Sequence, residues 1–228
     1  MNLSDLFPSN YIPSNDKDPD APQSRYLTPS KVPDGSSITL RLCGTPSSGH
    51  VICGYSYFTS ENQPRRFPTF PKNYLDDIGL SWEGKTKGTG EKARPVYFLS
   101  WACMVKGSED FQILTIEQTK VREAIEKTLS MEDYTIEAGE MANFFLDISR
   151  SGKGKDTSYT VIPTLKVASK EDQKRWQESR SGIWLPALFE GGDPFAGKPS
   201  GHSAPSGGPM TSRDELGADQ EIAASDAW

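Results

Sequence analysis

The chain has 228 residues, enough for one domain of ordinary size with appendages or for two small domains. The formal net charge of −6 is unevenly distributed, because residues 211–228 hold five acids against one arginine. Three cysteines without a C-x-x-C pair argue against a disulfide framework and favour a reducing compartment. No apolar run approaches the ~20 residues that span a bilayer, and the first residues do not predict a signal peptide.

The N-terminal part is rich in Pro, Ser and Asp, and we expect residues 1–25 to form an extended arm. Alternating apolar residues then predict one strand in SSITLRLCG (36–44) and a second in HVICGYSYF (50–58). The short segment TPSSG (45–49) between them predicts a hairpin-like connection.

Residues 60–94 form a long irregular stretch that is interrupted by three prolines and contains many basic residues. A loop of this length inside a domain is usually functional or disordered. After it, PVYFLSWACMV (95–105) is the strongest predicted strand of the chain, and FQILTI (111–116) is its return strand. One face of the strong strand must belong to the core, and the sequence leaves open which one.

The segment EQTKVREAIEKTL (117–129) has a different period. Its apolar residues recur every four positions from Val121, with charges between them, which predicts one amphipathic helix. Two further strands follow in MANFFLDISR (141–150) and TSYTVIP (157–163), joined by the basic turn SGKGKD.

The predicted order is β-β-β-β-α-β-β. Strands outnumber helices, so the fold class is mainly β and suits a small Greek-key barrel rather than a doubly wound α/β sheet. A second short helix is expected over 170–179, followed by an apolar plug in GIWLPALF (182–189). The predicted organisation is a domain over 26–190, then a flexible Gly/Ser/Pro linker and an acidic C-terminal tail over 191–228.

Catalytic motifs are weak in this chain. The spacing G-x-x-x-x-G-K-T occurs at 79–86, but prolines before it and glycines after it exclude the strand and helix that a phosphate loop needs. Asp76, Asp77, Asp147 and Asp156 are scattered without a shared site, and two histidines do not make a metal centre. We therefore expect no enzyme activity, no metal and no cofactor.

Aromatic strands that alternate with basic loops favour binding instead. Proteins that bind single strands combine a basic groove for the phosphates with aromatic faces on which bases stack, at about 1–3 kcal/mol per base and without sequence preference. The candidate nucleic-acid-binding residues are Tyr55, Tyr57, Phe58, Arg65, Arg66, Lys85, Lys87, Lys92, Arg94, Tyr97, Phe98, Trp101, Arg150, Lys153, Lys155 and Tyr159.

Three segments occur in a suggestive order: PDGSSITLRL, RPVYFLSWACMVKGSEDFQILTIEQTKVREAI and DISRSGKGKDTSYTVIP. Over residues 26–165 the chain resembles the single-stranded-DNA-binding proteins of tailed bacteriophages. The resemblance implies an OB fold that coats and protects single-stranded DNA during phage DNA replication, recombination and repair, in the cytoplasm of the bacterial host. The long 60–93 loop and the hydrophobic 183–189 segment depart from the family pattern, which leaves open which loop side chains face the strand.

The acidic tail has an expected role of its own. Single-strand binders of bacteria and phages often end in a flexible acidic tail, which implies recruitment of a replication protein such as a polymerase, helicase or nuclease. The candidate partner-binding residues are Asp214, Glu215, Asp219, Glu221, Asp226 and Trp228. Tryptophan is favoured at interface hot spots, so Trp228 is the expected apolar anchor. The alternative for the tail is a disordered, solubilising end.

Two other functions stay open. A single-strand annealing or recombination accessory protein would self-assemble, and GIWLPALF is the segment that would serve it. An RNA-binding OB module would have to contact the 2′-hydroxyl directly. Self-association on DNA is also left open.

Overall fold

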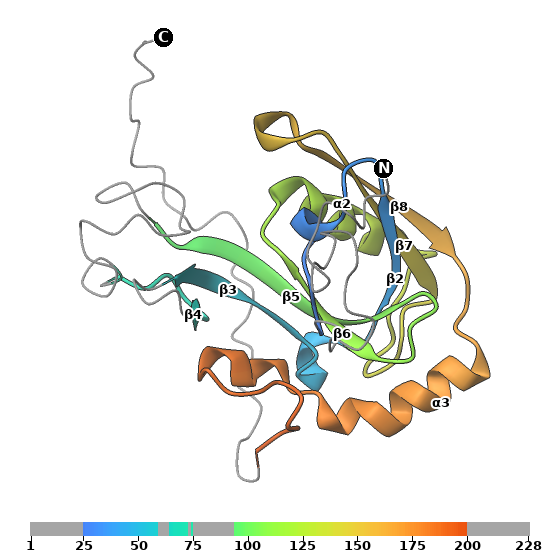
Figure 1. The fold of residues 1–228 in the computed structure, drawn as a ribbon. Helices are drawn as coiled ribbons and strands as arrows, with labels where there is room; N and C mark the ends of the chain where they lie inside the picture. The colour runs from blue at the N-terminus through green and yellow to red at the C-terminus, as the bar shows by residue number, and fades with distance from the viewer. Residues whose placement is uncertain (1–24, 59–63, 73, 75–93, 200–228) are drawn as a thin grey trace, which may run out of the picture.

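The computed structural model describes residues 25–58, 64–72, 74 and 94–199 (Figure 1). Its strands are β1 (Tyr26–Leu27), β2 (Ser37–Leu42), β3 (Val51–Phe58), β4 (Pro64–Phe67), β5 (Val96–Val105), β6 (Phe111–Ile116), β7 (Phe144–Ser151) and β8 (Ser158–Leu165). The α-helices are α2 (Thr119–Leu129) and α3 (Lys170–Ser179), and the last short 3₁₀ helix is η7 (Leu185–Phe189). The mainly β class is confirmed. The predicted arm before residue 25 lies outside the described residues.

The strands form one open mixed sheet around β5, in the order β1-β6-β5-β2-β7-β8 with β3 and β4 branching from it. One edge of β5 pairs with β6, and its other edge pairs first with β3 and then with β2 (Figure 1). β4 lies within the stretch predicted to be irregular. It begins at Pro64 and, among the described strands, pairs with β3 alone, as expected for proline in a strand at the edge of a sheet.

The predicted hairpin between the first two strands is wrong. β2 and β3 lie one after the other along the same edge of β5, with Leu42 opposite Cys103 and Val51 opposite Trp101. The connection makes a 3₁₀ turn and ends at Gly49, whose φ is 76°. A side chain there would also overlap the ring of Trp184, so glycine is required for two reasons.

The predicted amphipathic helix is confirmed as α2, and it covers the inner face of the sheet. Val121 and Ile125 are buried against a core that includes Leu40, Trp101 and Phe144. These apolar residues lie four positions apart, which places them on one side of the helix. The charged positions between them face outward, as the sequence pattern predicts.

The outer face of β5 and β6 is also buried, because the segment 168–195 packs across it. Phe98 and Phe111 belong to this second core together with Trp176 of α3 and Leu185 of η7. The Trp176 indole donates a hydrogen bond to the Gly139 carbonyl at 2.8 Å. The central strand therefore has no open face along its middle, although its sequence pattern requires only that one face belong to the core.

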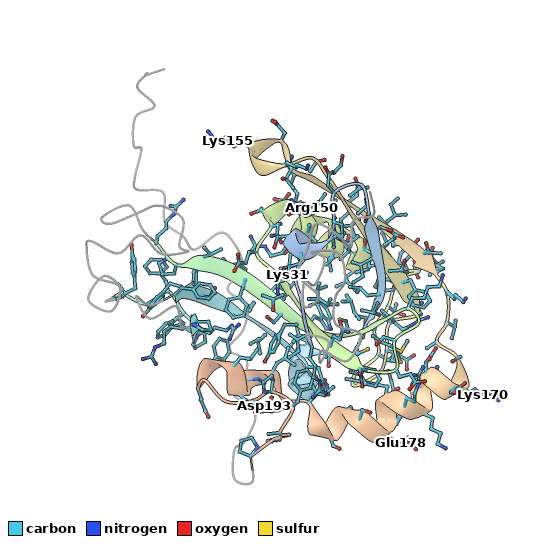
Figure 2. The ribbon with its side chains drawn as sticks, viewed as in Figure 1. Lys31, Arg150, Lys155, Lys170, Glu178 and Asp193 are labelled. Atoms are coloured by element: carbon cyan, nitrogen blue, oxygen red, sulfur yellow. The ribbon has the colours of Figure 1, made fainter. Side chains whose placement is uncertain are left out.

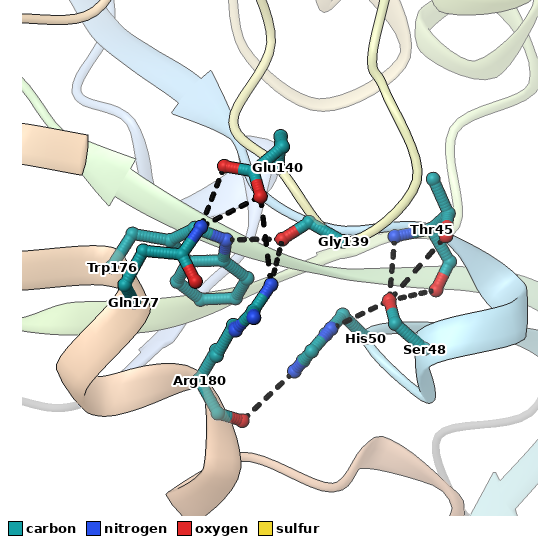
Figure 3. A network of polar contacts seen from close by, with 8 residues as sticks. All are labelled: Thr45, Ser48, His50, Gly139, Glu140, Trp176, Gln177 and Arg180. Atoms are coloured by element: carbon teal, nitrogen blue, oxygen red, sulfur yellow. Dashed lines mark hydrogen bonds and ion pairs between the residues drawn. The ribbon is translucent and has the colours of Figure 1, made fainter. Parts of the chain in front are cut away.

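A polar network ties the β2–β3 connection to the C-terminal end of α3 (Figure 3). Nδ1 of the buried His50 lies 2.7 Å from the Ser48 hydroxyl, and Nε2 lies 3.0 Å from the Arg180 carbonyl. A carbonyl only accepts, so Nε2 carries the proton and donates it to Arg180. Burial lowers the pKa of His50, despite the opposing effect of this hydrogen bond, and the ring is neutral at pH 7.

Packing continues beyond residue 190. The Pro194 carbonyl accepts a hydrogen bond from the Trp184 backbone N–H at 2.7 Å. The Phe195 ring contacts Tyr26, with ring centroids 6.3 Å apart, and the Arg25 guanidinium lies 3.4 Å from its centroid. No helix in the described part of the chain is long and apolar enough to cross a membrane.

Candidate functional site

Aromatic rings gather where β3, β4 and β5 extend beyond the two cores. Tyr55 of β3 lies opposite Tyr97 of β5 and Phe67 of β4, so all three side chains share one face of the sheet. The Tyr55 ring centroid is 5.3 Å from that of Tyr97 and 5.3 Å from that of Phe70, both in edge-to-face contact. We call this group, which consists of Tyr55, Tyr57, Phe67, Phe70, Tyr74 and Tyr97, the aromatic cluster.

The exposed rings of the cluster are Phe70 and Tyr97, which are 46% and 39% accessible. They flank the half-buried Tyr55, whereas Tyr57 is 1% exposed and stacks on Phe67 at 5.6 Å with nearly parallel planes. Two accessible rings on a rigid aromatic base present surface on which planar groups can stack. Phe70 is absent from the candidates derived from the sequence, because its segment carries no strand pattern.

A cation from α2 completes this face. The Arg122 guanidinium carbon lies 4.6 Å from the centroid of the Tyr97 ring, and Nη1 donates to the Tyr97 carbonyl at 3.4 Å. Nη2 lies 3.2 Å from the Thr119 hydroxyl. Arg122 is not among the candidates derived from the sequence. The feature that could have indicated it is the short connection between β6 and α2. Because Ile116 at the end of β6 lies opposite Leu99, this connection brings the start of the helix beside the start of β5.

Arg65 and Arg66 point to opposite faces of β4. Arg65 lies opposite Tyr57 and is exposed on the face of the aromatic cluster. Arg66 lies opposite Ser56, and both arginines are in the lining of a cavity of about 420 Å³ under η7. Burial lowers the pKa of Arg66, and its guanidinium carbon is 6.0 Å from the Phe98 ring centroid. Arg66 is therefore on the face of β4 opposite to the aromatic cluster.

Three predicted aromatic contacts are inside the protein. Phe98 is fully buried in the outer core, and Tyr57 is covered by its neighbours in the cluster. Trp101 is 7% exposed in the inner core, where its indole donates to the Gly44 carbonyl at 3.1 Å. These rings cannot stack on a base in this arrangement, so the prediction is wrong for them. Tyr159 is half-buried and packs against the inner core.

Of the cations predicted to bind DNA on the β7–β8 hairpin, one is hydrogen-bonded within the protein and two are exposed. Arg150 is bound by the protein itself, because its Nη1 donates to the carbonyls of Ser30 and Val32 at 3.1 and 3.0 Å. Lys153 and Lys155 are exposed in the turn, and Figure 2 shows Lys155 at the tip of the hairpin. The remaining described candidates are the partly buried Phe58 at the end of β3 and the exposed Arg94 just before β5.

Several candidates lie outside the described residues. They are Lys85, Lys87 and Lys92 in the long stretch, the 79–86 glycine motif, and the tail residues Asp214, Glu215, Asp219, Glu221, Asp226 and Trp228.

The Tyr97 phenol is neutral at pH 7. Burial, with a smaller contribution from the neighbouring Cys53 thiol, raises the pKa of Tyr97 above its ordinary value. Burial also raises the pKa of Cys103 to about 12 and that of Cys43 well above the usual range, which makes both thiols unreactive. The cluster is therefore a neutral aromatic surface with cations beside it.

Within the described ranges, no group of three or more His, Cys, Asp or Glu side chains could hold a metal ion. No protein-family model matches the chain, and no curated protein or solved structure shows significant similarity to it.

Proposed function

We propose that the protein binds single-stranded DNA without sequence specificity through the aromatic cluster. The observation that carries this proposal is the pair of accessible rings, Tyr97 and Phe70, on either side of Tyr55. Arg122 and Arg65 supply positive charge beside them. Bases stack on rings while the cations follow the phosphates, and a duplex cannot use such a surface because its bases are already stacked.

The strand pairing supports an OB-type barrel. β2 pairs with both β5 and β7, β5 pairs with β6, and the helix α2 lies between β6 and β7 in the chain. This is the order of a partly open Greek-key barrel of five strands, if β2 and β3 are counted as one interrupted strand. Oligonucleotides contact such barrels on the central strands and on two loops. Those loops correspond to the long basic stretch before β5 and the β7–β8 turn.

The segment 168–195 changes where a strand can bind. It fills the outer face of β5 and β6, on which an OB barrel would otherwise present its ligand-binding surface. We therefore place the contact at the ends of β3, β4 and β5, where the aromatic cluster is open. Lys153 and Lys155 on the β7–β8 turn provide a second basic position on this path.

In this proposal the protein coats and protects single strands during phage DNA replication, recombination and repair in the host cytoplasm. Its acidic tail recruits replication proteins, with Trp228 as the apolar anchor. Pull-down of a polymerase, helicase or nuclease from infected cells, with Trp228→Ala as the matched variant, tests the recruitment. Equal capture by both proteins would remove the tail from the proposal.

Titration of labelled oligonucleotides tests the DNA binding. Three of the five tryptophans, Trp101, Trp176 and Trp184, are buried, so intrinsic fluorescence is a poor reporter of a bound strand. Fluorescence anisotropy with labelled oligo-dT, oligo-rU and duplex DNA of equal length avoids this problem. We expect much tighter binding to oligo-dT than to duplex, and weaker binding as salt rises. Equal affinity for the duplex would reject the proposal.

The alternative function in strand annealing requires self-assembly through GIWLPALF (182–189), and the burial of this segment does not support it. Ile183, Leu185 and Leu188 are buried against the protein's own outer core. They are not available for contact between copies while the domain is folded.

A further inference from the structure

The elements that bound a second polar cavity, among them the start of α3, lie at the opposite end of the molecule from β4 (Figure 1). It has a volume of about 470 Å³ and is bounded by the β5–β6 turn, the ends of β2 and β8, and the start of α3. None of the nucleic-acid-binding candidates lines it. The Lys170 label at the start of α3 marks this region in Figure 2.

The floor of the cavity contains a buried cation, Arg41, which is 1% exposed. Its Nη1 donates to the carbonyls of Ala142 and Lys166, both at 2.6 Å, and the Phe145 ring centroid lies 4.0 Å from its guanidinium carbon. Its Nε has no hydrogen-bond partner, and no described carboxylate lies within ion-pair distance of it. A buried charge in this condition is costly, so an anion that reached it would be bound favourably.

The walls add positive charge and apolar surface. Lys106 and Lys166 are exposed on the rim, and Val167 beside them is 72% exposed. Asp172 on α3 forms an ion pair with Arg175 at 2.6 Å, and its charge acts on Arg41 only from beyond ion-pair distance.

The acids on the rim decide between two classes of anion. Glu109, Glu171 and Asp172 line the cavity among the cations. A nucleic-acid backbone carries a charge on every nucleotide and cannot avoid these carboxylates, whereas a peptide can place uncharged residues beside them. A peptide can place one carboxylate on Arg41 and an apolar side chain on Phe145 and Val167.

We propose that this cavity binds the acidic segment 214–228 of the chain. That segment has five acids and includes an aromatic residue, Trp228. A carboxylate of the segment pairs with Arg41, Lys106 and Lys166, and its apolar side chains cover Phe145 and Val167. The proposal does not depend on DNA binding, because it uses none of the residues assigned to the strand.

A full-length variant with its five tail acids changed to amides, Asp214→Asn, Glu215→Gln, Asp219→Asn, Glu221→Gln and Asp226→Asn, keeps the cavity free of its own segment. A labelled synthetic peptide with the natural 211–228 sequence is titrated into it at low salt, and binding is followed by anisotropy. Adding Lys106→Gln and Lys166→Gln should weaken binding about tenfold, because two charge-assisted contacts are lost. The matched control is Lys127→Gln with Lys174→Gln, which removes the same charge from α2 and α3 away from the cavity and should leave the affinity unchanged.

Two further measurements separate the outcomes. Arg41→Lys keeps the charge but loses the guanidinium, whose Nη1 contacts two carbonyls. Peptide binding should weaken in this variant, and a melting curve checks that the variant is folded. Oligo-dT should not displace the peptide. Equal weakening by both lysine pairs, displacement by oligo-dT, or equal binding of a peptide whose acids are amides would each overturn the proposal.

Discussion

The Arg122 side chain of α2 packs against Tyr97 at the exposed end of β5. The guanidinium carbon lies 4.6 Å from the ring centroid, and the same side chain donates to the Tyr97 carbonyl. This double contact fixes the ring and places a cation beside it. A ring that is already ordered loses little entropy when a base stacks on it, which favours binding.

Replacing Tyr97 with alanine should therefore weaken binding of oligo-dT by about 1–3 kcal/mol. Tyr97→Phe keeps the ring and should retain most of the affinity. Met131→Ala is the control, because Met131 is 41% exposed and lies outside the aromatic cluster. Anisotropy titrations measure the affinity, and a thermal melt checks that stability changes little. An unchanged affinity for Tyr97→Ala would remove this ring from the binding surface.

Adjacent arginines on β4 give a matched pair of variants. Arg65→Gln should weaken binding and reduce the slope of log K against log salt by about 0.7, because one phosphate contact is lost. Arg66→Gln removes the same charge from the opposite face and should leave the slope unchanged. Titrations at several salt concentrations measure both. The same reduction for both variants would contradict the assignment of the two side chains to different faces.

Trp101 should govern stability rather than binding. It is buried in the inner core, so Trp101→Ala should lower the free energy of unfolding by about 3–5 kcal/mol. Urea unfolding measures this loss. The folded fraction should bind oligo-dT as the unchanged protein does. A stable variant with weak DNA binding would mean that the ring is accessible to the strand.

Stability should depend on pH through His50. Burial lowers its pKa in the folded protein below 6.5, so the unfolded chain binds a proton more readily. The contribution is complete above the unfolded pKa of about 6.5 and is lost as pH falls through the lower folded value. Urea unfolding at about pH 7.5 and about pH 5.5, above most carboxylate titrations, measures the loss.

His50→Gln keeps an N–H donor but does not titrate, so it should remove this part of the pH dependence. The neighbouring charged groups, Arg180 and Glu140 at 3.6 Å from it, are the same in both proteins. An equal loss in both proteins would assign the effect to other groups.

Cations of the β7–β8 hairpin should have separable effects. Arg150→Gln loses the hydrogen bonds to Ser30 and Val32, and each is worth about 1.5–3 kcal/mol because the donor is charged. Its main effect should therefore appear in a melting curve. Lys153→Gln with Lys155→Gln should leave the melting temperature unchanged and weaken binding of oligo-dT. The reverse pattern would exchange the two roles.

The positions of the helices and strands can be predicted from the sequence, but the pairing between strands cannot. The four-residue period from Val121 predicts α2, and alternation predicts β7 and β8, because both patterns are local. Nothing local distinguishes two strands that form a hairpin from two strands that share the edge of a third. The β2–β3 connection was predicted wrongly for this reason.

The sequence of β5 contains an indication that both of its faces are buried. The run VYFLSWACMV is nearly continuous in apolar residues, and such runs are typical of strands buried on both faces. Read in this way, the sequence predicts that Phe98 and Trp101 are both internal. The site was only partly predictable, because Tyr55 and Tyr97 lie on strands, whereas Phe70 and Arg122 reach the cluster only through tertiary contacts.

The middle of β5 is paired on both edges by strands from different parts of the chain. Leu99 and Trp101 lie between β3 and β6, and Cys103 lies between β2 and β6. Amide protons in this position are released only when several segments separate together. Their hydrogen-exchange rates should thus report the free energy of global unfolding. Amides of β4, which pairs with β3 alone among the described strands, should exchange through local opening while the rest of the sheet stays intact.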